Sequence, residues 1–426
     1  MLTDPEERRR MRQQKAAERR QRQAQSRKLL LRLGIAAVVL AACGILIFSL
    51  SKKAPEQNTS QADTTPPEQN TIGQTAPPET TSPPTTVIHY AAVGDLNVNE
   101  STVYAGGASL LYTDTFMDVA HLLSDADITS VNFEGTLCGE PYGSSASAPQ
   151  SMAEALRSAG VDLVQMANSY SISRGLSGLA SSIDAIRTAG MEPLGVYATN
   201  ADFKAEKGYT IRVVNGIKLA FVAFTKGMDG MALPEGSENC VNILYEDYDS
   251  VYQDVDTAKI TSILEAVAKE EPDLVVALLH WGSEFNNTIS ASQEEIAKLL
   301  QSYGVDAIIG THSHYVQKMT LDETSGQFIA YSLGDFFSDG KKSGSEYSVV
   351  LDLEITKDNT TGETKITNFT YTPIFTIHEP GMPLQVVRLQ EAMAAYESNY
   401  IDKISEDTYN QMLYAQSRIE ARIAGE

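Results

Sequence analysis

Residues 305–314 read VDAIIGTHSH, a short apolar run that ends in two histidines separated by one residue. A run of this length between polar residues is typical of a strand buried in a parallel sheet. Side chains at positions i and i+2 of an extended chain face the same way, so His312 and His314 can reach one metal ion or two adjacent ions. This stretch therefore predicts both a fold and a site.

Four further apolar runs end in a polar side chain. They are residues 87–94 before Asp95, 128–133 before Glu134, 161–167 before Asn168, and 274–279 before His280. Segments of helical periodicity lie between the runs, at 115–123, 152–159, 176–188, 257–269 and 292–303. Strands that alternate with helices predict a parallel sheet. The carboxyl ends of its strands gather at one edge, where α/β proteins bind ligands.

The other segments predict antiparallel additions and a helical C-terminus. Asn215-Gly216 divides residues 209–225 and is the preferred dipeptide of a type I′ hairpin. Residues 345–356 and 365–377 alternate as strands do. Residues 384–425 have helical periodicity, and we expect their apolar face to pack on the domain. That face consists of Tyr409, Met412, Leu413, Ile419 and Ile423.

The motifs at the strand ends resemble those of the capsule-synthesis (CapA) family, which is linked to poly-γ-glutamate biosynthesis. In order they are Ala92-Val93-Gly94-Asp95, Asn132-Phe133-Glu134-Gly135, Ala167-Asn168, His280-Trp281-Gly282, Gly310-Thr311-His312-Ser313-His314 and Tyr331-Ser332-Leu333-Gly334-Asp335-Phe336. The resemblance covers about residues 87–380. It implies an α/β fold similar to calcineurin-type metallophosphatases, a β-sandwich flanked by helices in an α/β/β/α order.

The same resemblance implies a metal site. The positions that match the family pattern are Asp95, Glu134, His280, His312 and His314. His280 is also a candidate for a catalytic role. Mixed oxygen and imidazole ligands suit a divalent transition metal such as Mn, Fe or Zn better than Ca or Mg. Whether one ion or two bind is left open.

One motif departs from the family pattern. Where the family has Ala-Asn-Asn-His, this chain reads Ala167-Asn168-Ser169-Tyr170. In related phosphoesterases the second Asn binds metal and the His protonates the leaving group, so these roles fall on Ser169 and Tyr170. A tyrosine with a pKa of about 10 is a much weaker acid than an imidazolium. Asn168 is an alternative ligand. Tyr170 is the catalytic candidate, and Asn168 and Arg174 are candidate substrate contacts.

The N-terminal region predicts a membrane anchor. Residues 33–50 contain no charge and are just long enough to span hydrocarbon. The eleven Lys and Arg of residues 1–32, against four Asp and Glu, favour a cytoplasmic N-terminus and an extracellular domain. The alternative is a cleaved signal peptide, but its basic region would be unusually long and no A-x-A site follows.

Composition completes the predicted organisation. It comprises a basic tail (1–32), a transmembrane helix (33–50), a Pro/Thr/Ser-rich spacer (51–86), the CapA-like domain (87–380) and a helical segment (381–426). The net charge is −22, so the chain beyond the tail carries about −29. Such an acidic body repels nucleic acid and excludes it as a partner. The pairing of Cys138 with Cys240 is left open.

Three functions are compatible with these features. The first is a cell-membrane protein that handles poly-γ-glutamate or a similar anionic surface polymer, working with other capsule-assembly membrane proteins. Contact with the polymer would then run through a metal or through a few basic residues, such as Arg174, Lys226, Lys341 and Lys342. The second is a metal-dependent phosphoesterase. The third is a scaffold that keeps the fold without the activity.

Overall fold

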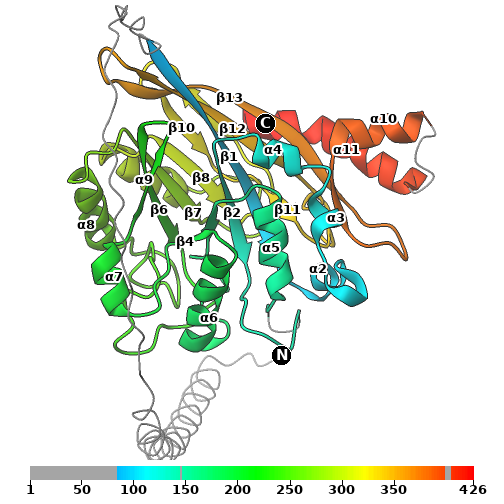
Figure 1. Cartoon of the computed structure of the whole chain (residues 1–426), viewed down its shortest axis with the longest axis horizontal. Coiled ribbons are helices and arrows are strands. Elements are labelled where there is room, and N and C mark those ends of the chain that lie inside the picture. Colours follow the sequence, from blue (N-terminus) through cyan, green and yellow to red (C-terminus); the bar gives the residue numbers. More distant parts are fainter. Residues whose placement is uncertain (1–83, 144–145, 399–403) are drawn as a thin grey trace, which may run out of the picture. The chain divides into compact units, whose positions relative to one another are not determined.

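The computed structural model describes residues 84–143, 146–398 and 404–426, and they form two β-sheets with helices on both sides (Figure 1). The predicted tail, membrane helix and nearly all of the spacer lie outside these ranges. None of the helices within them is long and apolar enough to cross a membrane.

The first sheet has a parallel half and an antiparallel half. Its order is β14-β13-β12-β1-β2-β3-β4, and β11 also pairs with β1. Pairing is parallel from β1 to β4 and antiparallel from β1 to β14. The strands are β1 (Thr85–Asn97), β2 (Ile128–Glu134), β3 (Leu163–Gln165), β4 (Glu192–Leu194), β11 (Asp335–Phe337), β12 (Tyr347–Asp358), β13 (Thr364–Ile377) and β14 (Gln385–Arg388).

The second sheet has the order β5-β6-β7-β8-β10-β9, with parallel pairs between β6, β7, β8 and β10. Asn215 and Gly216 have φ values of 48° and 84°, as a type I′ turn requires, and they join β5 to β6 as predicted. The strands are β5 (Thr210–Val214), β6 (Ile217–Thr225), β7 (Leu274–His280), β8 (Ala307–Thr311), β9 (Met319–Asp322) and β10 (Gln327–Ala330).

Three apolar layers give the fold its α/β/β/α order. One lies between the two sheets, where β1, β12 and β13 face β6, β7 and β8. A second lies between the first sheet and helices α5 and α6, and a third between the second sheet and α8 and α9. The helices are α2 (Glu100–Tyr104), the 3-10 turn η1 (Gly107–Ser109), α3 (Thr113–Phe116), α4 (Ala120–Ser124), α5 (Gln150–Ser158), α6 (Gly175–Thr188), α7 (Asn200–Glu206), α8 (Thr257–Ala268), α9 (Ala291–Ser302), α10 (Leu389–Glu397) and α11 (Glu406–Ala424).

The structure corrects three of the predicted elements. The helix predicted at 115–123 is two short helices, α3 and α4, and Phe116 of α3, Val119 of the turn between them and Leu123 of α4 are buried. The C-terminal segment begins with strand β14, because β-branched Val386 and Val387 extend the sheet beside β13. On α11, Met412, Ile419 and Ile423 are buried as predicted, but Leu413 is 41% exposed.

Candidate metal centre

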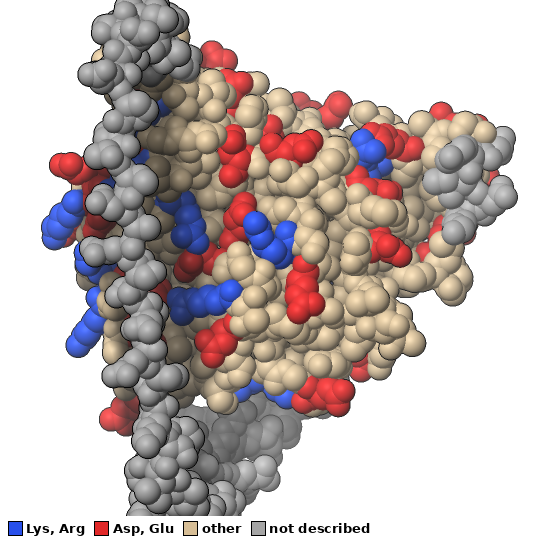
Figure 2. Space-filling model, viewed as in Figure 1, with Lys and Arg blue, Asp and Glu red and all other residues tan. Residues whose placement is uncertain are grey.

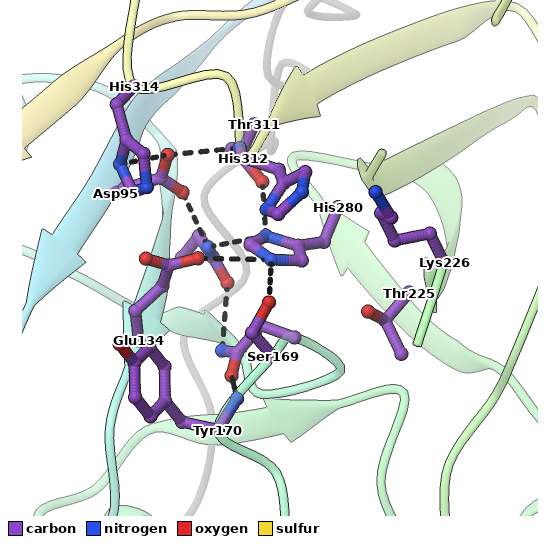
Figure 3. Close-up of polar contacts among 12 residues, drawn as sticks. Asp95, Glu134, Ser169, Tyr170, Thr225, Lys226, His280, Thr311, His312 and His314 are labelled. Carbon is purple, nitrogen blue, oxygen red and sulfur yellow. Dashed lines mark hydrogen bonds and ion pairs between the residues drawn. The ribbon is translucent and has the colours of Figure 1, made fainter. Parts of the chain in front are cut away.

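The carboxyl ends of strands from both sheets meet at one place. Asp95 lies in β1 and Glu134 ends β2. His280 ends β7, and the loop that carries His312 and His314, here called the histidine loop, follows β8. Thr225 pairs with His280, and His280 with Thr311, so the ends of β6, β7 and β8 are level with one another. Figure 3 shows the resulting convergence of side chains from segments far apart in the sequence.

Six buried side chains form two groups with the donor atoms of a metal site. Within each group the candidate ligand atoms all lie within 4.8 Å of one another, close to the spacing of ligands that share one ion. One group is Glu134, His280 and His312, and the other is Asp95, His314 and Asp335. All five predicted ligands are thus brought together, and Asp335 joins them.

The histidine loop serves both groups, but not by the predicted geometry. His312 and His314 have φ values of 85° and 57°, so neither residue is extended. A left-handed backbone is costly for a non-glycine residue and persists where function requires it. Here it directs His312 to the first group and His314 to the second. The premise of an extended chain was wrong, and the alternation of i and i+2 does not explain the arrangement.

Two glycines bring Asp95 and Asp335 together. A Cβ atom on Gly94 would lie 1.8 Å from the carbonyl oxygen of Gly334, so only glycine fits there. The Asp95 N–H donates to that same oxygen at 2.9 Å, and β11 pairs Asp335 in register with Asp95. Our sequence reasoning missed Asp335 as a ligand. The repeated Gly-Asp step, at 94–95 and 334–335, is the signal that could have found it.

Asn132 links the two groups. Its Nδ2 donates to Asp95 Oδ1 at 2.6 Å and lies 3.3 Å from His280 Nδ1. Its Oδ1 accepts a hydrogen bond from Asn168 Nδ2 at 3.1 Å. Asn168 also donates to the Phe133 carbonyl, and its Oδ1 accepts the N–H of Tyr170. Both the nitrogen and the oxygen of the Asn168 amide are therefore hydrogen-bonded within the protein. The bond from Asn168 to Asn132 holds the Asn132 side chain in place.

Ser169 and Tyr170 lie at the first group. The hydroxyl of Ser169 is 3.1 Å from His280 Nε2, and Glu134 Oε1 is 3.0 Å from the same nitrogen. Ser169 therefore contacts a candidate ligand, in the position that the family pattern gives to the second Asn. Tyr170 is 38% exposed, and burial of its hydroxyl together with the nearby carboxylate of Glu134 raises its pKa to about 12.

Other predicted residues lie apart from the two groups. Arg174 donates to the carbonyl of Glu140 at 3.4 Å, and no contact among the described residues joins it to either group. Cys138 and Cys240 are both free thiols. His89 also lies apart, 3.0 Å from the carboxylate of Asp352.

Burial controls the protonation of the site. It raises the pKa of Glu134 well above its usual value and that of Asp95 to about 6, with the Asp335 carboxylate adding to the shift at Asp95. Burial also lowers the pKa of His280 and His312 well below the usual value, helped at His312 by the charge of Lys226. At His314 burial is outweighed by Asp335, Glu134 and Asp95, which raise the pKa. Neutral imidazoles are the form that binds metal.

One buried atom of the first group, His312 Nδ1, has no hydrogen-bond partner among the described residues. Glu134 Oε1 lies 3.0 Å from His280 Nε2, so its near neighbour is itself a candidate ligand atom. Carboxylate oxygens and imidazole nitrogens are ligand atoms that a divalent cation accepts, and a bound cation would satisfy the unpaired buried nitrogen. The residues present therefore fit a metal ion.

Known proteins are similar to this chain over much of its length. At 28% identity it matches the capsule biosynthesis protein CapA of Bacillus anthracis over 58% of each chain. At 25% identity it matches the PGA biosynthesis protein CapA of Bacillus subtilis over 48% of this chain and 50% of the relative. The matches thus span only about half the length of these relatives.

Two solved structures align with much of this chain at low identity. A calcineurin-like phosphoesterase YfkN from Bacillus subtilis covers 80% of this chain and 99% of its own at 13% identity, with a TM-score of 0.42. A phosphatase from Mycoplasma pneumoniae covers 68% and 94% at 14% identity, with a TM-score of 0.41. Similarity at this level carries no information about activity.

The family assignment comes from the match over residues 89–340, more than half of the chain, which includes both groups of candidate ligands. The family is described as bacterial capsule synthesis protein PGA_cap, and this chain belongs to it.

Proposed function

We propose that this chain is a metal-binding capsule synthesis protein that handles poly-γ-glutamate or a similar anionic surface polymer. The observation that carries the proposal is the buried His312 Nδ1, which has no partner among the described residues and lies within a cluster of carboxylates and imidazoles. Family membership supplies the biological setting.

The metal would be a divalent transition ion such as Mn, Fe or Zn. Glu134, His280 and His312 would hold one ion, and Asp95, His314 and Asp335 a second. When bound, such ions supply positive charge and Lewis acidity at the site. Asn132 holds Asp95 through its amide, and Ser169 contacts His280, so both ligands are kept in position.

Charge argues for a local contact with the polymer. Acidic side chains are spread over the face seen in Figure 2, and the whole chain carries a net charge of −22. A surface of this kind does not attract a polyanion broadly. Binding would therefore depend on the metal centre and on the few cations beside it.

A binding experiment tests this function. The purified full chain, with and without Mn²⁺, is titrated with poly-γ-glutamate, and His312→Ala is compared with the control His121→Ala at an exposed histidine. We expect binding that depends on Mn²⁺, is lost in His312→Ala and is retained in His121→Ala. Equal binding with and without metal, or no binding by the metal-loaded protein, would overturn the proposal.

A metal-dependent phosphoesterase is the second candidate, favoured by the two adjacent ligand groups. Its weakness is the proton donor, because Tyr170 has a pKa of about 12. The same weakness motivates the scaffold alternative, in which the fold and the metal are kept without bond chemistry. Metal-dependent hydrolysis of a simple phosphodiester separates these two alternatives.

We further propose that residues 33–50 hold the protein in the cell membrane in a single pass, with the N-terminus cytoplasmic and the domain outside. The uncharged run and its basic flank support this topology. The site would then meet a newly exported polymer, beside other membrane proteins of capsule assembly. Protease treatment of intact cells tests the topology, since an extracellular domain is cleaved and a cytoplasmic one is protected.

A further inference from the structure

Two lysines flank the metal centre, one beside each ligand group. Lys226 directly follows β6, and its backbone N–H donates to the carbonyl of His280 at 2.8 Å. Figure 3 shows its side chain next to the rings of His280 and His312. Lys342 is linked to the second group through Phe285, because its Nζ is 5.5 Å from the centre of the Phe285 ring. That ring stacks on His314 at 4.8 Å.

Neither ammonium group has a carboxylate partner among the residues that the structure describes. Lys226 Nζ donates to the Gly282 carbonyl at 2.8 Å and lies 4.5 Å from the centre of the Tyr252 ring. An ammonium has three donors, so this contact leaves part of its capacity unused. Lys342 is exposed, and within the described ranges its ammonium group contacts only the face of the Phe285 ring.

The other two basic candidates have contacts elsewhere. Lys341, next to Lys342 in the chain, pairs with Asp339. Arg174 donates to the Glu140 carbonyl. Of the four candidate cations, only Lys226 and Lys342 have a contact that leads to a ligand group among the residues that the structure describes, through His280 and through Phe285.

We infer that Lys226 and Lys342 are the anion-contacting residues of this site, and that the ligand is a chain bearing more than one oxyanion. This inference rests on the proposed function. A cation at each ligand group together with a lysine beside each group makes two electropositive points, and each attracts one oxyanion. A linear polyanion can occupy both, and the acidic surface around them repels it elsewhere.

Lys226 contributes more than Lys342. It is half-buried, so its contact with an oxyanion is less screened by solvent than that of the exposed Lys342. The ring of Phe285, which is 39% exposed, contacts the ammonium group of Lys342. Phe285 itself has a φ of 52°, a left-handed backbone conformation that is costly for a non-glycine residue. Its ring stacks on His314 and also contacts Lys342.

The test compares two probes, a short γ-linked glutamate oligomer and inorganic phosphate, on the Mn²⁺-loaded full chain by calorimetric titration. The variants are Lys226→Gln, Lys342→Gln and the double variant. Lys259→Gln is the control for Lys226, because Lys259 is also a partly buried lysine that donates to backbone carbonyls and lies over an aromatic ring. Lys341→Gln is the control for Lys342.

For the oligomer we expect Kd to rise about tenfold in Lys226→Gln, about threefold in Lys342→Gln and about thirtyfold in the double variant. Lys226→Arg should recover most of the loss, because it restores the positive charge. For phosphate, the double variant should bind no more weakly than the weaker single variant. The two control variants should stay within twofold of the unaltered protein.

Two results would overturn the inference. One is an oligomer Kd that neither lysine variant changes more than its control does. The other is a phosphate Kd that rises in the double variant as steeply as that of the oligomer, which would mean that one small anion contacts both lysines. Metal content is measured in every sample. An unaltered chain without metal would refute the proposed function, whereas a loaded chain insensitive to both lysines would refute only this inference.

Discussion

At residues 169 and 170 the chain lacks the amide and the imidazole that the family pattern places there. The Ser169 hydroxyl contacts His280, and Tyr170 holds its proton too tightly to act as an acid near neutral pH. We expect the double change Ser169→Asn and Tyr170→His to raise Mn²⁺-dependent hydrolysis of a phosphodiester by about 100-fold, the usual effect of a general acid.

The control for this change is Ser169→Ala with Tyr170→Phe, which removes both hydroxyls without supplying a ligand or an acid. Initial rates with and without Mn²⁺ give the comparison. If the unaltered protein already turns over as fast as the Asn-His variant, the site does not depend on these two positions and our account of them is wrong.

Asp306 makes stability depend on pH at a place away from the metal centre. Its carboxylate accepts the N–H of Val275, and burial raises its pKa from 3.8 to about 6. The folded protein therefore holds this proton more tightly than the unfolded chain. The stability from this group is complete below about pH 4 and is lost as pH rises to about 6.

Asp306→Asn keeps the acceptor and removes the charge. We expect it to leave the free energy of unfolding unchanged at pH 4 and to raise it by about 1–3 kcal/mol at pH 8, measured by urea denaturation. If Asp306→Asn is no more stable than the unaltered protein at pH 8, the ionised carboxylate does not destabilise the fold.

Helix α11 offers a sharp comparison between neighbouring residues. Met412 is fully buried between α11 and the sheets, whereas Leu413 is 41% exposed. Met412→Ala should lower the free energy of unfolding by about 2–5 kcal/mol, and Leu413→Ala should change it by less than about 0.5 kcal/mol. Similar losses for both would mean that α11 does not pack on the domain through this face.

The elements that the sequence predicts well are those whose pattern is local. Buried parallel strands such as β7 and β8 read as continuous apolar runs, and the hairpin turn is encoded in two residues, Asn215 and Gly216. Strand β11 could not be found in this way. It has three residues and exists because it pairs with β1, more than 200 positions away in the chain.

The candidate site shows the same division. Residues at strand ends could be named from the sequence, because parallel topology gathers those ends at one edge. Asp335 follows a Gly as Asp95 does, but that it lies beside Asp95 depends on the contact between Gly94 and Gly334, which only the fold reveals. The distribution of His312 and His314 between two groups depends on left-handed backbone angles that the pattern of the sequence does not reveal.

At the scale of the whole molecule, the two sheets bring the ends of β1 and β2 against those of β7 and β8 and so create the metal centre. Neither sheet alone carries a complete group: His280 and His312 come from the second sheet, while Glu134 comes from the first. Metal binding should therefore stabilise the packing of the two sheets. We expect Mn²⁺ to raise the midpoint of thermal unfolding of the unaltered protein. The rise in the midpoint should be smaller for His312→Ala.

The central claim is that this cluster binds metal, and elemental analysis of the purified full chain tests it most directly. The account predicts bound Mn, Fe or Zn approaching two ions per chain, and a clear loss in the double variant Glu134→Gln and His312→Ala while His121→Ala keeps its full content. A chain that contains no metal after loading, or a content that the double variant leaves unchanged, would contradict it.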